Sequence, residues 1–259
     1  MYNKRLPMLW TTHLDFKKGG ERNFPSVCCL CYSDSLQDYI QTKSFLHPNE
    51  RVYLNQLQYN SRIKSYLAGR YAGKNAVSVL SGGEKLSAIA IEPGIFHQPI
   101  VHFSGRPGIQ VTISHCDDLG VALSYLDACP LGIDIEQVQI DKQAVLTEQM
   151  TAEEHVLMKS LPFSSIHSLT LFWTVKESLS KVLKIGFTSP IDTFAIHTVE
   201  IAHPVIISYF KYFPQYCATS FTFGSYVCSI THPKGVCWSK DSIYRLLSQV
   251  IPVLEGITL

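Results

Sequence analysis

Two short segments contain residue types that could act on a phosphate ester. They are residues 132–136 (GIDIE) and residues 173–181 (WTVKESLSK). In the first, apolar and acidic residues alternate with the period of a half-buried strand, which places Asp134 and Glu136 opposite the two isoleucines. Adjacent carboxylates repel each other, and a bound Mg²⁺ would relieve that repulsion. An isolated Asp-x-Glu is more often a solvated sheet edge, so this segment is weak on its own.

The second segment predicts an amphipathic helix with a reactive polar side. Glu177 and Lys181 are four residues apart and so lie one turn apart on one face, together with Trp173. An ordinary surface pair of this kind contributes about 0.3–0.5 kcal/mol. A tryptophan on a polar face is less ordinary, and it indicates that this face lines a groove. The opposite stripe is predicted to face the core, and it comprises Phe172, Val175, Leu179, Val182 and Leu183.

A third segment, residues 111–116 (VTISHC), precedes both in the chain. Its β-branched residues predict a strand that ends in the pair Ser114-His115. A histidine at this position can donate a hydrogen bond to a phosphate oxygen, or it can satisfy a local carbonyl group. The order of the three segments is more informative than any one of them.

That order closely resembles the large, single-chain class of 4′-phosphopantetheinyl transferases, which activate carrier proteins of nonribosomal peptide, polyketide and fatty acid synthesis. The resemblance runs from about residue 62 to residue 187, roughly half of the chain. Residues 113–116 (ISHC) and 67–70 (LAGR) are more similar to the siderophore-associated branch of that class.

The resemblance implies roles for individual residues. Asp134, Glu136 and Glu177 would hold Mg²⁺, with Mn²⁺ as the alternative, against the pyrophosphate of coenzyme A. Glu177 would also take the proton of the carrier's serine, directly or through water, and Lys181 would stabilise the departing 3′,5′-ADP. The remaining predicted contacts to coenzyme A come from His115, Ser114, Arg62, Arg70 and Arg106.

The chain departs from the family at one basic position. Members usually carry Gly-Lys-Pro or Gly-Arg-Pro before the Ser-His strand, whereas this chain has His97-Gln98-Pro99. Either Arg106 takes over the phosphate contact or affinity for coenzyme A is reduced. The other alignment assigns the role to residues 105–107 (GRP), which lie close to the strand.

General chemistry supports the same roles for a base, a metal ion and a lysine, independently of the resemblance. A serine hydroxyl is a poor nucleophile until a base accepts its proton. A metal ion neutralises the attacked phosphate, and a lysine offsets charge that grows on the leaving group. A Mg²⁺-dependent nuclease or phosphohydrolase uses a similar acidic cluster, but no Glu-x-Lys follows Asp134. A non-catalytic protein that only binds coenzyme A is the third possibility, and Gln98 leaves room for it.

Composition agrees with a globular enzyme. The chain has 259 residues, of which 46% are hydrophobic and 17% charged, and its formal net charge is +1. This length and composition can bury a sizeable core, and the absence of a dense Lys/Arg block disfavours a nucleic-acid partner. The apolar runs are much shorter than the ~20 residues that span a bilayer, and the N-terminus resembles no signal sequence. We therefore expect a cytoplasmic protein that does not act at a membrane, and the resemblance adds that it is a monomer.

Eight cysteines do not form a convincing metal or disulfide pattern. The cluster Cys28-Cys29-Leu30-Cys31 is too tight for a tetrahedral zinc site, and the other five are scattered. We expect buried, reduced thiols.

The remaining pattern predicts an α+β fold. A helix is expected over residues 60–80, with Gly82 and Gly83 ending it, and another begins at Thr151, where Thr151 and Glu154 form a capping box. Strands are expected over residues 121–126 and 131–137, and several more after residue 191. On the helix over 60–80, Arg62, Arg70 and Lys74 share one side, which either grips phosphates or is solvated. The resemblance adds two similar halves related by a pseudo-twofold axis, residues 1–125 and 126–259. Coenzyme A would lie in the cleft between them, and the metal-binding acidic residues would lie in the second half.

Overall fold

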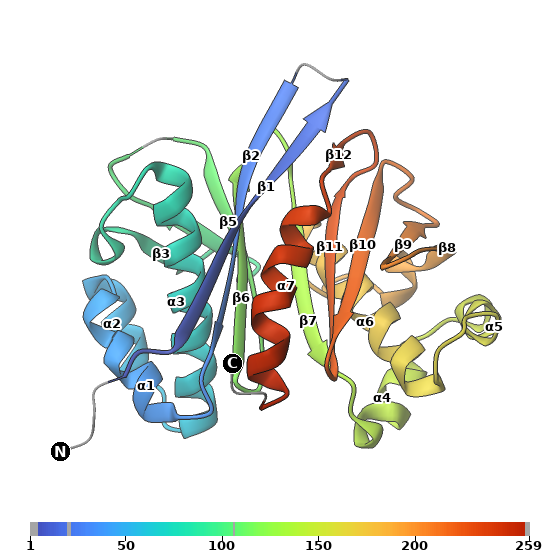
Figure 1. The fold of residues 1–259 in the computed structure, drawn as a ribbon, viewed down its shortest axis with the longest axis horizontal. Helices are drawn as coiled ribbons and strands as arrows, with labels where there is room; N and C mark the ends of the chain where they lie inside the picture. The colour runs from blue at the N-terminus through green and yellow to red at the C-terminus, as the bar shows by residue number, and fades with distance from the viewer. Residues whose placement is uncertain (1–4, 20–21, 106, 257–259) are drawn as a thin grey trace.

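Two antiparallel sheets, each covered on its outer face by a long helix, form the framework of the molecule (Figure 1). The computed structural model describes residues 5–19, 22–105 and 107–256. The first sheet has the strand order β12-β1-β2-β6-β5. Its strands are β1 (Met8–Lys18), β2 (Arg22–Tyr32), β5 (Ile109–Cys116), β6 (Leu119–Leu126) and β12 (Cys237–Trp238).

The second sheet has the order β7-β11-β10-β9-β8. Its strands are β7 (Gly132–Gln137), β8 (Ile196–Ala202), β9 (Val205–Phe210), β10 (Tyr216–Phe223) and β11 (Tyr226–Pro233). A small hairpin of β3 (Ala90–Pro93) and β4 (Pro99–His102) stands apart from both sheets. The fold therefore mixes helices and antiparallel sheets, which confirms the predicted α+β class.

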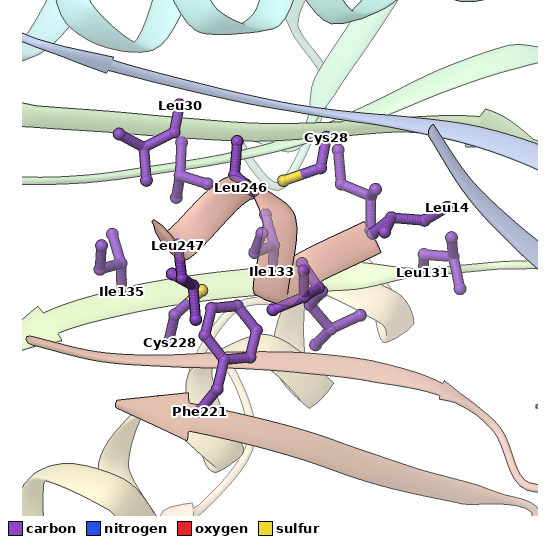
Figure 2. Close-up of a cluster of buried hydrophobic side chains, with 14 of the residues drawn as sticks. Leu14, Cys28, Leu30, Leu131, Ile133, Ile135, Phe221, Cys228, Leu246 and Leu247 are labelled. Carbon is purple, nitrogen blue, oxygen red and sulfur yellow. The ribbon is translucent and has the colours of Figure 1, made fainter. Parts of the chain in front are cut away.

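The hydrophobic core consists of three clusters, and each of them contains residues of one long helix. The helix α3 (Asn60–Ser81) packs on the first sheet, and α6 (Ser165–Leu183) packs on the second. Between the sheets lies α7 (Asp241–Leu254), whose Leu246 and Leu247 contact both of them. Figure 2 shows this central cluster, in which Ile133 and Ile135 of β7 face the helix. The sequence patterns did not anticipate α7 or the long hairpin of β1 and β2.

The helix α3 matches the prediction over residues 60–80 closely. Its glycines permit close packing against β5, because a Cβ atom at Gly73 would lie 2.8 Å from a side-chain carbon of Ile113. The helix ends at Gly82, which adopts the left-handed conformation with φ of 93°. Two further short helices, α1 (Leu36–Gln41) and α2 (Pro48–Leu54), precede it.

The order of elements is repeated along the chain. β2, β6 and β5 are neighbours in the first sheet in the same way as β7, β11 and β10 are in the second. The helices α1 to α3 follow β2, as α4 (Gln143–Glu148), α5 (Ala152–Lys159) and α6 follow β7. A twofold axis between two halves divided at residue 125 remains a prediction. The last segment does not stay with the second sheet, because β12 pairs with β1.

Each repeat contains a buried lysine that pairs with a buried glutamate. Lys74 of α3 pairs with Glu50 of α2, and Lys176 of α6 pairs with Glu154 of α5 at 2.7 Å. Both glutamates also complete capping boxes at the start of their helices, and the box of Thr151 and Glu154 was predicted. Each glutamate therefore joins a helix terminus to the neighbouring long helix.

Seven of the eight cysteines are buried and free, as predicted, whereas Cys237 is exposed. Burial raises the pKa of the Cys116 thiol to about 12, with smaller contributions from Glu136 and Asp117. None of the helices that the structure describes is both long and apolar enough to cross a lipid bilayer.

Candidate functional site

The site is built around β7, which sends its side chains alternately to two faces. Ile133 and Ile135 enter the central core, whereas Asp134 and Glu136 point toward α6, as the alternation predicted. The prediction of a half-buried strand was wrong, because residues 132–135 are all buried and Asp134 is only 3% exposed. The reason is that α6 covers the face that was expected to meet solvent.

Close packing of α6 on β7 depends on Gly132. A Cβ atom at this position would lie 2.0 Å from the carbonyl oxygen of Ser178, so any side chain would push the helix away. The same packing brings Glu177 and Lys181 of α6 over the acidic face of β7. The glycine therefore fixes the distance between the two segments that carry the predicted chemistry.

A line of side chains joins the two sheets where β5 and β7 face each other, and we call this contact the seam. The backbone N–H of Ile133 donates to Thr112 Oγ1 at 3.2 Å, and that of Ile135 donates to Ser114 Oγ at 3.4 Å. The N–H of Gln137 donates to Cys116 Sγ in the same way. Side chains at alternate positions of β5 thus accept the N–H groups of β7, where backbone carbonyl groups would accept them in a continuous sheet.

Asp134 lies at the centre of the site. Its Oδ1 accepts hydrogen bonds from Ser114 Oγ and from Lys181 Nζ, each at 2.7 Å. Its Oδ2 is buried and has no hydrogen-bond partner among the described residues. Lys181 Nζ also donates to the carbonyl oxygen of Ile133 at 3.0 Å, which leaves one of its three N–H groups free.

Glu177 has a strongly perturbed carboxyl group. Burial raises its pKa to about 7, and the negative charges of Asp134 and Glu136 act in the same direction against the opposing effect of Lys181. It has no hydrogen-bond or ion-pair partner among the described residues. The pKa of Glu136 is also raised by burial and by Asp134, although Lys142 Nζ donates to its Oε2 at 3.0 Å. No sequence pattern indicated Lys142.

His115 keeps an exposed edge beside these groups. Desolvation by the surrounding protein and the ammonium group of Lys181 lower its pKa, as does the nearby exposed Arg62. A neutral imidazole next to two cationic side chains is a suitable donor to a phosphate oxygen. The structure therefore places Arg62 and His115 close to the group of Asp134 and Lys181.

A cavity of about 210 Å³ opens beside the seam, and we call it the seam cavity. The predicted polar face of α6 lines it through Glu177 and Lys181, and Gln98 lines it from the turn between β3 and β4. Gln98 Oε1 accepts a hydrogen bond from the backbone N–H of Phe96. The remaining lining residues are Phe96, His97, Pro99, Val111, Thr112, Ile113, Tyr125, Ser180, Lys184 and Gly186.

Trp173 lines a second hollow, next to Glu136. This hollow is lined by Glu136, Lys142 and Trp173, together with Gln137, Asp141, Val145, Leu146 and Thr170. The expectation that the polar side of this helix faces a groove is therefore met by two cavities, with Glu177 bordering the first and Glu136 the second.

Some predicted ligand contacts are already used within the fold. Ser114 is buried and its hydroxyl group supports Asp134 and β7, so it positions the site instead of facing a ligand. Arg70 lies 3.4 Å from Glu50 and over the ring of Tyr66. Lys74 is buried against Glu50, so neither a phosphate grip nor a solvated face is correct for it. Arg106 lies outside the described residues.

The donor chemistry fits a hard divalent cation in part. The unpartnered Oδ2 of Asp134 and the mutual repulsion of Asp134, Glu136 and Glu177 are both features that a cation would relieve. As the side chains stand, no group of three or more His, Cys, Asp or Glu residues in the described ranges is arranged to hold a metal ion. Lysines occupy two of the carboxylate oxygens, Asp134 Oδ1 and Glu136 Oε2.

Comparison with known families matches residues 130–231 to the 4′-phosphopantetheinyl transferase superfamily. This segment contains Asp134, Glu136, Glu177 and Lys181, and the match confirms the resemblance read from the motifs. The large single-chain subclass and the siderophore-associated branch stay predictions.

Among solved structures, one similar chain is a holo-(acyl-carrier-protein) synthase from Bacillus anthracis str. Ames in complex with CoA (3′,5′-ADP). The two are 20% identical with a TM-score of 0.35, over 45% of this chain and 96% of that chain. Comparison with curated proteins gave no match.

Proposed function

We propose that this chain, which matches the 4′-phosphopantetheinyl transferase superfamily over residues 130–231, transfers 4′-phosphopantetheine from coenzyme A to a serine of an apo carrier protein. The observation that carries the proposal is the position of Glu177. Its carboxyl group has a pKa of about 7, lies beside Asp134 and Glu136, and borders the seam cavity. A base with a pKa near the working pH is the group that this transfer requires.

In the proposed reaction, the serine oxygen of the carrier attacks the β-phosphorus of coenzyme A while Glu177 accepts its proton, directly or through water. The new P–O bond forms as the bond to the departing 3′,5′-ADP breaks. The free N–H of Lys181 offsets the negative charge that develops on the leaving oxygen. The bonds of Lys181 to Asp134 and Ile133 hold its ammonium group in place for this role.

The residues that would hold Mg²⁺ or Mn²⁺ are Asp134, through its unpartnered Oδ2, Glu136 and Glu177. A bound divalent cation would supply charge neutralisation and orientation of the pyrophosphate. In the structure, Lys142 and Lys181 supply part of the compensating positive charge. His115 and Arg62 would contact a phosphate group, and the nearness of both Arg62 and Lys181 to His115 supports this.

The test is to incubate the protein with coenzyme A, Mg²⁺ and a panel of apo acyl and peptidyl carriers, and then to weigh the carriers by mass spectrometry. We expect a mass gain equal to phosphopantetheine on at least one carrier, and its loss on addition of EDTA. Glu177→Gln should reduce the rate by at least about 100-fold, because general-base catalysis contributes 10²–10⁴-fold. Glu148→Gln, on the exposed surface, is the matched control.

Three outcomes would contradict this proposal. Nucleic-acid cleavage without a carrier mass gain would favour a phosphohydrolase. Binding of coenzyme A without any transfer would favour a non-catalytic protein. Near-normal transfer by Glu177→Gln would show that the base is another residue.

A further inference from the structure

Lys184 has an unusual backbone conformation for a lysine, and it lies at the edge of the seam cavity. It caps the C-terminal end of α6 with φ of 58° and ψ of 27°, in the left-handed region. Helices that end in this way normally place glycine at the position, because a Cβ atom is disfavoured there. The Lys184 side chain is half-buried and lines the cavity together with Glu177 and Lys181.

The charge of Lys184 is not compensated within the fold. Its Nζ donates to Gln110 Oε1 at 3.1 Å, and this acceptor is a neutral amide. In the described part of the chain, no carboxylate lies within ion-pair distance of it. The other lysine of the cavity, Lys181, is paired with Asp134 at 2.7 Å. Lys184 is therefore the described cavity lysine whose positive charge remains available.

Helix stabilisation does not explain this arrangement. A cation near the C-terminal end of a helix interacts favourably with the helix dipole, but it does not need the left-handed conformation to do so. Lys181 already provides a positive charge in the last turn of α6. Residues in such sparsely populated backbone conformations cluster at active sites and ligand-binding sites.

We propose that Lys184 binds a phosphate group of the coenzyme A donor in the seam cavity. It would replace the lysine or arginine that family members usually carry where this chain has Gln98. This inference rests on the proposed function. The hydrogen bond from Lys184 Nζ to Gln110 of β5 links the C-terminal end of α6 with the first sheet, next to the cavity that Lys184 lines. A charge-assisted bond from an ammonium group to a phosphate is stronger than a bond between neutral groups.

The experiment measures binding of coenzyme A by isothermal titration calorimetry, with dephospho-coenzyme A as the second probe. We compare the unsubstituted protein with Lys184→Gly, Lys184→Arg and the control Lys211→Gln, whose lysine pairs with Glu153 on the surface. Lys184→Gly should raise the Kd for coenzyme A by about tenfold or more. Lys184→Arg and Lys211→Gln should stay within about twofold of the unsubstituted protein.

The second probe identifies the phosphate. A loss confined to coenzyme A assigns the contact to the 3′-phosphate, and an equal loss for both donors assigns it to the pyrophosphate. Lys184→Gly should also keep or raise the midpoint of thermal unfolding, since glycine fits the left-handed position better.

An unchanged Kd for Lys184→Gly would overturn the inference, as would a weaker Kd accompanied by a lower unfolding midpoint. Both results leave the proposed function intact if the unsubstituted protein binds coenzyme A and modifies a carrier. Failure of the unsubstituted protein to bind either donor would overturn the inference and the proposed function together.

Discussion

Three carboxylates that lie close together have different surroundings, and these differences separate their roles. Asp134 has two hydrogen-bond donors on one oxygen, and Glu136 has Lys142, whereas Glu177 has neither kind of partner among the described residues. No such partner offsets the burial of Glu177, and its pKa rises to about 7. A group that is already poised between its two charge states is suited to accept and release a proton.

The raised pKa of Glu177 predicts a pH dependence of folding stability. Between the ordinary pKa of 4.5 and about 7, the folded protein holds this proton more tightly than the unfolded chain does. The free energy of unfolding therefore falls as the pH rises through this interval. Glu177→Gln removes the repulsion, so we expect a gain on the order of 2 kcal/mol at pH 8 and much less at pH 5.

Urea unfolding of both proteins at pH 5, 6.5 and 8 checks this prediction, with Glu148→Gln as the exposed control. Parallel pH profiles for Glu177→Gln and the unsubstituted protein would show that Glu177 ionises normally in the fold.

The contact between the two sheets along the seam could not be predicted from the sequence. β5 and β7 are edge strands of different sheets, and the side chains of Thr112, Ser114 and Cys116 accept the N–H groups of β7. Small hydroxyl and thiol side chains at alternate positions are necessary for this contact. Larger side chains would separate the two sheets.

Thr112→Val tests the seam, because it keeps the shape of the side chain and removes the acceptor. The buried N–H of Ile133 would lose its partner, and such a loss costs about 1–3 kcal/mol of unfolding free energy. Thr222→Val, on an exposed position of β10, should change stability by less than about 0.5 kcal/mol. Hydrogen exchange at the Ile133 amide should accelerate in the first variant, and equal exchange rates in both proteins would contradict this account of the seam.

The sequence predicted those features of the helices and strands that depend only on residues close together in the chain. The glycine cap of α3, the capping box of Thr151 and the alternation in β7 depend on neighbouring residues, and each was found where expected. The burial of Asp134 was not predictable, because it depends on α6, which begins only at Ser165. The burial and the hydrogen bonds of Ser114 and Lys74 also depend on partners that are distant in the chain, Asp134 and Glu50.

Two buried ion pairs occupy corresponding places in the repeated order of elements. Lys176 and Glu154 are both fully buried, and Glu154 also accepts from the backbone N–H of Ile196. Lys74 and Glu50 repeat this arrangement, with Glu50 accepting from Ile91. Each pair therefore joins a short helix, a long helix and the strand segment that follows the long helix.

Lys176→Met is expected to destabilise the fold by about 3–5 kcal/mol, because it leaves the Glu154 carboxylate buried without its partner. The matched control is Lys211→Met, which breaks the exposed pair with Glu153 and should cost about 0–1 kcal/mol. Chemical denaturation of the two variants measures the difference. Similar losses in both would mean that Glu154 finds another partner or becomes protonated at little cost.

The absence of a backbone ladder along the seam has a consequence for how ligands and folding are connected. Thr112 and Ile113 of the first sheet and Glu177 and Lys181 of α6 line one cavity, so a molecule bound there contacts the first sheet and the helix that covers the second sheet. Such a molecule acts as a noncovalent cross-link between these two parts of the fold, in addition to the side-chain hydrogen bonds of the seam and the core around α7. The melting temperature should therefore increase with the logarithm of donor concentration once the site is saturated.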